Sequence, residues 1–241
     1  TVGFDVSLVD STQLPPAASM LEAGGVTKVA GGVVASSKTG FRKFEMVSSF
    51  GDPATLCEGI PIALIDSAVT AAGQVFAALS EDGQIYLRRV SVQENLLTGE
   101  ETITLSGGEM PLDAPEDWGK PKFLQITSSG NMVSVAWPDG NLMRFDTRDF
   151  DNPQFAEQVD LVPEAGAELT VVDAIIGNKT LKVGDSLGNV YAWFPIRRDP
   201  AADTVDGWTL VRAHKLEGEG SPVTALESST RTRTVAIGYG D

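Results

Sequence analysis

One pattern recurs along the chain: a short apolar strand, a tight turn that contains glycine, and a second short apolar strand. The turn glycines are Gly40, Gly83, Gly140 and Gly188, which are 43, 57 and 48 residues apart. The flanking runs alternate in hydropathy and are rich in β-branched and aromatic residues, which predicts antiparallel hairpins. Repeats at this spacing are typical of the blades of a β-propeller rather than of a helical solenoid.

Two repeats fill out to four strands each, at 123–127, 132–137, 141–147 and 155–162, and at 169–173, 180–184, 190–196 and 208–213. We therefore predict an all-β, WD-repeat-like propeller of four-stranded antiparallel blades, an incomplete ring of about four or five blades. The usual Trp-Asp end of a WD repeat is absent. Residues 1–241 form one propeller fragment, in which 1–10 are the last strand of an incomplete blade. The blades are expected at 25–58, 60–107, 121–163 and 168–214, with a truncated one at 221–241.

The first strand of each unit is the most apolar, as in the run 169–172. A strand that neighbouring blades cover on both faces has this composition, so we expect the first strands to lie nearest the axis and to be covered on both faces. The strand-poor connections 106–121 and 196–207 are expected to be surface loops. Residues 12–25, which include a Pro-Pro pair, are expected to form a loop or cap.

Charge and hydropathy exclude several classes of protein. The formal net charge of −15 repels nucleic acid and anionic membrane surfaces, so neither is an expected partner. Hydrophobic residues make up 42% of the chain, yet no run reaches the roughly 18 apolar residues of a membrane span. There is no signal-peptide-like leader. Because the first residue is Thr1 rather than Met, we expect a trimmed chain or a fragment of a longer one.

The chain has one cysteine, Cys57, and one histidine, His214. A single cysteine excludes an internal disulfide, and one residue of each kind cannot form a zinc site of the usual Cys/His type. We expect Cys57 to be packed as a small buried hydrophobe.

Gly184-Asp185-Ser186-Leu187 spells the signature of the GDSL hydrolases, whose serine attacks esters. A serine nucleophile needs a base, which in that family is a histidine with an aspartate three positions before it. The only histidine is His214, and Val211 stands three positions before it. Aligned on the turn glycines, Ser186 takes a hairpin position, so we interpret the motif as a turn and keep an esterase only as a minor alternative.

The acidic loop formed by Asp113, Glu116 and Asp117, and the pair Glu217 and Glu219, are rich in the oxygen ligands that calcium prefers. Neither has the spacing of a known calcium loop, so we interpret both as solvated loops. Residues 178–180, Asn-Lys-Thr, form a glycosylation sequon, which matters only in a glycosylating pathway. We assign no catalytic, cofactor-binding or metal-binding residue.

Basic residues cluster in three places: Arg88 and Arg89, Arg197 and Arg198, and Arg231 and Arg233. Charges at strand ends suppress edge-to-edge pairing, and this is the interpretation we favour over contact with an acidic partner. Large aromatic side chains dominate burial. We therefore expect the tryptophans to pack between blades or to cover the core: Trp118, Trp137, Trp193 and Trp208.

The last quarter of the chain contains LKVGDSLGNVYAWFPIRR from residue 181, then TLVRAH at 209–214 and SPVTAL at 221–226. This succession of a Gly-Asp-x-x-Gly hairpin, an Ala-Trp-Phe strand and a Ser-Pro-Val-x-Ala-Leu strand resembles the soluble insert of long-form Pst-type phosphate ABC transporter permeases of Gram-negative bacteria. The resemblance implies an extracytoplasmic propeller between membrane helices that this chain lacks.

From that resemblance we expect a non-enzymatic domain on the periplasmic side of the inner membrane, which acts as a scaffold or docking surface in phosphate import. Its partners would be the other transporter subunits and the solute-binding protein, and it would meet the membrane only through segments outside this chain. The alternative is a free-standing propeller that binds a protein or peptide and has no connection to transport.

Overall fold

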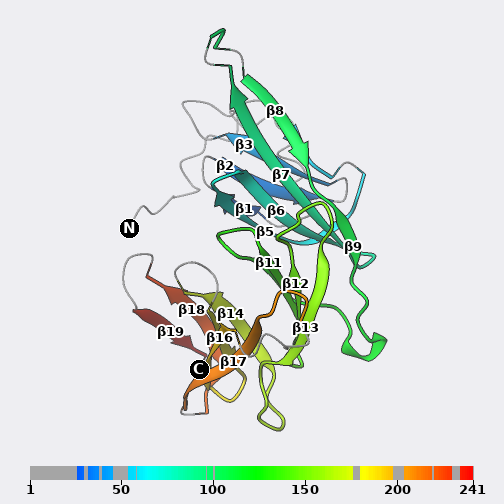
Figure 1. The fold of residues 1–241 in the computed structure, drawn as a ribbon. Helices are drawn as coiled ribbons and strands as arrows, with labels where there is room; N and C mark the ends of the chain where they lie inside the picture. Colours follow the sequence, from blue (N-terminus) through cyan, green and yellow to red (C-terminus); the bar gives the residue numbers. More distant parts are fainter. Residues whose placement is uncertain are drawn as a thin grey trace.

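The computed structural model of the protein describes residues 26–29, 32–37, 40–45, 54–57, 59–95, 97–99, 101–175, 180–197, 204–218, 220–229 and 234–240. These residues form antiparallel sheets that follow one another along the chain, as the strand pattern predicted (Figure 1). The expected strand at 1–10 and the loop at 12–25 lie outside the described residues. No described helix is long and apolar enough to cross a membrane.

Sheet 1 is built from β1 (Val26–Val29), β2 (Gly32–Ser37), β3 (Gly40–Glu45) and β4 (Ala54–Thr55). Sheet 2 is built from β5 (Ile62–Thr70), β6 (Gly73–Ser80), β7 (Gln84–Glu94), β8 (Glu101–Ser106) and β9 (Glu109–Pro111). In each sheet the strands lie in chain order, except that both β8 and β9 pair with β7.

Sheet 3 contains β10 (Phe123–Ile126), β11 (Met132–Ala136), β12 (Asn141–Asp146) and β13 (Gln154–Asp160). Sheet 4 contains β14 (Leu169–Ala174), β15 (Leu181–Asp185), β16 (Val190–Ile196) and β17 (Thr209–Leu216). Sheet 5 is the pair β18 (Val223–Ser228) and β19 (Val235–Tyr239). The four-strand patterns predicted for sheets 3 and 4 are confirmed, with differences of up to three residues at the ends of strands.

The turn glycines explain why three of the hairpins close where they do. Gly83, Gly140 and Gly188 have φ values of 85°, 95° and 89°. Each donates its N–H to the carbonyl three residues earlier, at 3.1, 3.1 and 3.2 Å. This left-handed backbone conformation strains any residue with a Cβ, so glycine at these positions fixes the turn and the register of the flanking strands.

Two predictions, one about a turn and one about a loop, are wrong. Gly40 is not a turn residue, because it is the first residue of β3 and pairs with Ser37 of β2. Only residues 38 and 39, which lie outside the described part of the chain, separate the two strands. The segment 106–121 is not a simple loop, since it holds β9 and the 3-10 helix η3 (Glu116–Trp118). The backbone passes from β8 to β9 at Gly107 and Gly108, and the Gly108 carbonyl accepts a hydrogen bond from Leu87 N at 2.9 Å.

The hydrophobic core lies mainly between successive sheets. One cluster joins β6 and β7 of sheet 2 to β11 and β12 of sheet 3 and includes Val75, Leu87, Val135 and Trp137. A second joins sheets 3 and 4 through residues such as Leu142, Leu161, Tyr191 and Trp193. A smaller cluster packs residues 56 and 57, which precede sheet 2, against β5 and β6. Another connects sheets 4 and 5. No sheet buries both of its faces alone, which is the physical basis of an array of stacked blades.

The first strands are not the most buried, contrary to the expectation from their composition. Every residue of β11 and β15 is buried, whereas most residues of β5 and β14 are only half-buried. A first strand lies at the edge of its sheet and has a strand on one side only. The second strand has strands on both sides and a neighbouring sheet over its faces, so it loses more of its exposure.

A hydrogen bond between the first strands joins sheets 2 and 3. The Asp66 carboxylate on β5 accepts a hydrogen bond from the backbone N–H of Ile126 on β10, with 2.8 Å between the two heavy atoms. Burial raises the pKa of Asp66, and the hydrogen bonds from the N–H groups of Ile126 and Ser67 offset this rise only in part. The folded protein therefore holds a proton on this carboxyl more readily than the unfolded chain does.

We expect the Asp66→Asn variant to be more stable than the native protein at pH 7. A carboxyl whose pKa is raised by folding stabilises the fold fully below its unfolded pKa of about 3.9, and this contribution is lost as pH rises through the folded pKa. Asparagine keeps an acceptor for Ile126 N–H and carries no charge, so this pH dependence should disappear. Urea unfolding between pH 3.5 and 7.5 measures both effects.

The control is Asp66→Ala, which also removes the charge but leaves the Ile126 N–H without its acceptor. Relative to Asp66→Asn, this variant should be less stable by about 1–3 kcal/mol, the cost of an unpaired buried donor, at every pH. A native protein that is more stable than Asp66→Asn at pH 7 would contradict the prediction.

Candidate interaction site at the junction of two sheets

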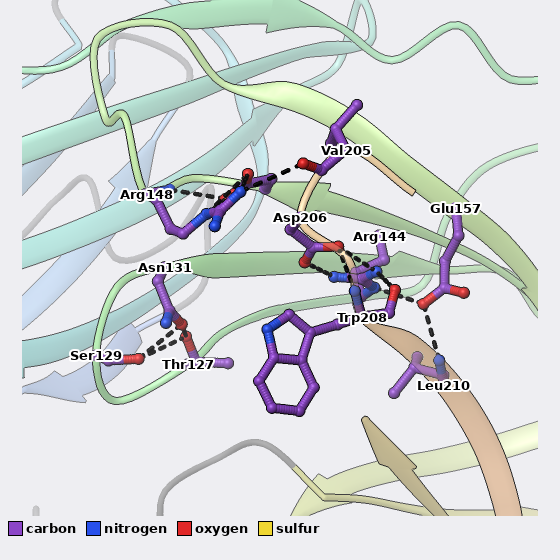
Figure 2. A network of polar contacts seen from close by, with 11 residues as sticks. Thr127, Ser129, Asn131, Arg144, Arg148, Glu157, Val205, Asp206, Trp208 and Leu210 are labelled. Carbon is purple, nitrogen blue, oxygen red and sulfur yellow. Dashed lines mark hydrogen bonds and ion pairs between the residues drawn. The ribbon is translucent and has the colours of Figure 1, made fainter. Parts of the chain in front are cut away.

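The polar centre of the junction between sheets 3 and 4 is Arg144, whose side chain is fully buried. It lies on β12 opposite Glu157 of β13, and its Nε donates a hydrogen bond of 2.6 Å to Glu157 Oε1. The other end of the guanidinium binds both oxygens of Asp206, with 3.1 Å between Nη2 and Oδ1. Nη2 also donates to the Trp208 carbonyl at 2.6 Å. A buried cation is tolerated because it has such partners (Figure 2).

The same carboxylates organise the backbone that leads into β17. Asp206 Oδ1 accepts a hydrogen bond from Trp208 N at 3.1 Å, and Glu157 Oε1 accepts one from Leu210 N at 2.9 Å. Because Glu157 belongs to sheet 3 and Leu210 to sheet 4, the network joins the two sheets. We call the four residues Arg144, Glu157, Asp206 and Trp208 the inter-sheet clamp.

Folding changes the pKa values of the charged groups of the clamp. Burial lowers the pKa of Arg144, but the hydrogen bonds and charges of Asp206 and Glu157 outweigh burial and raise it above its usual value. For Asp206, burial raises the pKa, while the Arg144 guanidinium and the Trp208 N–H together bring it below its usual value. Both groups are therefore charged near neutral pH.

An open hollow of about 600 Å³ lies beside the clamp, on the surface of the same junction. Its central cation is Arg148, whose side chain is 53% exposed and pairs with Asp146, at 2.6 Å between Nη2 and Oδ2. Arg148 also reaches the Val205 carbonyl at 3.4 Å, across the gap between the sheets. The lining is polar apart from one exposed valine: Asp146, Arg148, Asp149, Asn152, Gln154 and Val205.

A smaller cavity of about 40 Å³ also has Arg148 in its lining, together with Asn131, Met132, Pro195, Asp206 and Trp208. Asn131 belongs to the turn before β11, where its Oδ1 accepts hydrogen bonds from Thr127 at 2.9 Å and Ser129 at 2.7 Å (Figure 2). Arg148 thus lines both the open hollow and this smaller, mainly apolar cavity. The clamp and this turn hold the floor of the hollow in one arrangement.

The GDSL motif forms part of a hairpin. Ser186 Oγ accepts a hydrogen bond from the Glu168 backbone N–H at 2.9 Å, and Ser186 N donates to the Glu168 carbonyl at 2.9 Å. The fully buried Asp185 accepts hydrogen bonds from Asn189 and from the Tyr191 hydroxyl. His214 is exposed on β17, opposite Ala192, and its ring lies 6.3 Å from that of Phe194. This arrangement gives Ser186 a structural role as a hairpin residue.

The other sequence-based interpretations have mixed outcomes. Asp113, Glu116 and Asp117 are exposed, and within the described residues no three His, Cys, Asp or Glu side chains gather in a way that would hold a metal. Glu217 pairs with Lys215, at 3.9 Å between Oε1 and Nζ. Cys57 is buried among apolar residues, as predicted, and burial raises the pKa of its thiol to about 11. Predictions for five further positions fall outside the described residues: Asn178, Arg198, Glu219, Arg231 and Arg233.

The interpretation of Arg88 and Arg89 as strand-end charges is wrong. Both lie within β7. Arg88 donates hydrogen bonds to the carbonyls of Leu56 and Gly108, each at 3.2 Å, and so connects the chain after sheet 1 to the passage between β8 and β9. The guanidinium of Arg89 lies over the Phe150 ring, 4.6 Å from its centroid, and so contacts sheet 3. Arg197 is exposed, with its guanidinium 5.6 Å from the Trp208 ring.

Two tryptophans pack between sheets and a third covers the core, as expected. Trp137 is fully buried between sheets 2 and 3, and Trp193 is 7% exposed between sheets 3 and 4. Trp118 is half-buried and packs edge-to-face on Trp137, with ring centroids 5.0 Å apart. Trp208 is half-buried beside the smaller cavity.

The succession of antiparallel sheets defines the class of protein: the chain has a β-propeller fold. Comparison with solved structures confirms this fold. It is similar to the β-propeller domain of Cps50 (Swd1) from Myceliophteria thermophila, at 14% identity and a TM-score of 0.54, over 90% of this chain. It is also similar to BBS1N, solved in complex with ARL6DN, at 17% identity and a TM-score of 0.57, over 94% of this chain.

A third similar structure is a putative 6-phosphogluconolactonase from Bacteroides fragilis, at 15% identity and a TM-score of 0.56, over 88% of this chain. The chain spans 61% to 67% of the length of these three chains. No family model matches the sequence, and no curated protein does. At identities this low, the likeness establishes the fold alone.

Proposed function

We propose that this protein is a non-enzymatic β-propeller that binds another protein at the hollow between sheets 3 and 4. The observation that carries the proposal is the hollow itself: about 600 Å³, open, polar, and backed by the buried inter-sheet clamp. Small-molecule sites are mostly enclosed and apolar. A wide polar surface with one exposed apolar side chain, Val205, better fits the polar rim of a protein interface.

Lining residues that are already held in place reduce the entropy that binding would otherwise cost. Asp146 and Gln154 stand on strands, and Val205 precedes Asp206, which Arg144 binds. The charges in the lining nearly balance, with Arg148 among Asp146 and Asp149. Such a surface selects a partner by matching charge positions rather than by net attraction. The complex of BBS1N with ARL6DN supports this proposal as an example of a similar fold bound to another protein.

The experiment compares two charge reversals of the same sign at exposed carboxylates. Asp149→Lys places a cation in the hollow, whereas Asp113→Lys does so on the remote acidic loop. We expect Asp149→Lys to weaken partner binding about tenfold, equivalent to about 1.4 kcal/mol, and Asp113→Lys to leave it unchanged. The full-length tagged protein is isolated from its own cells, and bound proteins are quantified by mass spectrometry. Identical sets of bound proteins for both variants would overturn the proposal.

We also propose, from the resemblance of residues 181–241, that the partner belongs to a phosphate importer of which this propeller is the periplasmic part. The motifs that carry the resemblance span β15 to β18. The complete reading frame tests this second proposal. Apolar segments of roughly 20 residues on both sides would support it. A frame that closes the ring and stops would leave the free-standing interaction module.

A further inference from the structure

Strands β7 and β8 extend beyond the rest of sheet 2. β6 pairs with β7 only as far as the partners Gln74 and Val90. From Ser91 to Glu94, β7 pairs only with β8, which forms a two-stranded ribbon that projects from the sheet (Figure 1). We call residues 90–105 the arm. Its base is fixed by Ser91, whose hydroxyl donates a hydrogen bond of 2.6 Å to the Ala72 carbonyl.

The tip of the arm is an ordered turn that presents a leucine. Asn95 accepts hydrogen bonds from Leu97 N through its side chain at 3.0 Å and from Gly99 N through its carbonyl at 2.7 Å. Gly99 has a φ of 70°, which this turn requires. Leu97 is 96% exposed, the highest exposure among the large apolar residues of the described chain. The hydrogen bonds to Asn95 hold this turn, and the side chain of Leu97 lies in solvent.

The arm is amphipathic by register. Val90 pairs with Leu105, whereas the next pair, Ser91 with Thr104, is polar. Successive residues of a strand lie on opposite faces, so Leu105 and Thr104 face in opposite directions. We call Val90 and Leu105 the apolar row. Across the sheet the paired residues continue through the polar Gln74 to Val69, and both Val69 and Leu105 are 53% exposed. Its inner member, Val90, packs on the cluster around Cys57. The apolar row therefore extends the core of sheet 2 into solvent.

We propose that the arm is a docking element for a partner protein whose surface is apolar and bordered by lysine or arginine. The apolar row and Leu97 supply the hydrophobic contact. Charge complementarity follows from the sequence, in which Glu94, Glu100 and Glu101 adjoin residues 95–99 of the tip and the net charge is −15. A second copy is a poorer occupant, because it carries the same net charge of −15 and would be repelled.

This inference does not depend on the hollow between sheets 3 and 4. The test places a photo-crosslinking benzophenone amino acid at position 105 or 104 of the full-length protein in its own cells. Both positions are exposed and adjacent, and they differ only in the face they occupy. We expect one discrete adduct with another protein from position 105, at least fivefold stronger than from position 104. The crosslinked partner peptide should contain apolar residues next to lysine or arginine.

Charge is tested in the crosslinking protein by Glu101→Lys, which should reduce the adduct at least fivefold, while Glu116→Lys in the exposed loop should not. Unchanged thermal melts show that each variant is folded. The Asp149→Lys variant should keep the adduct, so failure of the hollow and failure of the arm are distinguishable. Equal adducts from positions 104 and 105, an adduct only with a second copy, or no adduct would each overturn the proposal.

Discussion

Replacing Arg144 with alanine is expected to lower the free energy of unfolding by about 3–5 kcal/mol, the cost of leaving buried carboxylates without their cation. Glu157 and Asp206 would both remain, with side chains only 10% and 4% exposed. The Trp208 carbonyl would also lose its donor. Urea denaturation at pH 7, with linear extrapolation, measures the loss. Because the hydrophobic core between sheets 3 and 4 remains in the variant, the transition should shift without losing cooperativity.

The matched control is Arg148→Ala, which removes the same type of side chain four residues away. Arg148 is 53% exposed and its pair with Asp146 is in contact with solvent. Its loss should therefore cost at most about 1 kcal/mol. A loss at Arg144 that is no larger than the loss at Arg148 would show that the clamp does not stabilise the junction.

The clamp also predicts part of the acid sensitivity of the protein. Folding lowers the pKa of Asp206, so its contribution to stability is present above the unfolded pKa of about 3.9 and is lost as pH falls through the folded pKa. In Arg144→Ala this contribution should be much smaller, and the variant should lose less additional stability below pH 4 than the native protein does.

The Trp137→Ala variant is expected to be destabilised by about 3–5 kcal/mol, because truncation leaves a large cavity in the core between sheets 2 and 3. Trp137 has no exposed surface, packs against Trp118, and donates a hydrogen bond from Nε1 to the Gly119 carbonyl at 3.2 Å. Chemical denaturation gives the total loss. In a double-mutant cycle with Trp118→Ala, the coupling between the rings should be about 0.5–1.5 kcal/mol.

Phe155→Ala serves as the control for truncation of an aromatic residue. Its ring is 45% exposed on β13, so its removal opens no closed cavity and should cost clearly less than removal of Trp137. Equal losses for the two variants would mean that burial between sheets does not determine the contribution of an aromatic residue in this fold.

The hairpins could be predicted because their signals are local. A turn that needs left-handed backbone selects glycine, and alternating apolar residues on both sides define two strands. Gly140 and Gly188 meet both conditions. At Gly40 the glycine begins a strand, and only the cross-strand pairing with Ser37 reveals the difference. The division of the outer strand of sheet 2 into β8 and β9 also had no local signal, since it depends on how each segment meets β7.

The candidate site lay beyond sequence analysis for a different reason. Arg144 and Asp206 are 62 residues apart, and nothing in either segment indicates that they meet. The one available signal was an arginine between Met143 and Phe145, in a strand whose two faces are covered in the folded protein. Arg88 was misinterpreted for the same reason, because its acceptors at Leu56 and Gly108 come from distant parts of the chain.

The sequence by itself determined the repeating unit: the glycine turns, the strands of sheets 3 and 4, and from their spacing the propeller fold. These features depend on backbone conformation and on hydropathy period, which neighbouring residues specify. Only the tertiary structure decided which charges are buried, where the hollow opens, and that Leu105 of the arm remains uncovered. Burial and ion pairing depend on segments that are distant in the chain, and the stacking of the sheets brings those segments together.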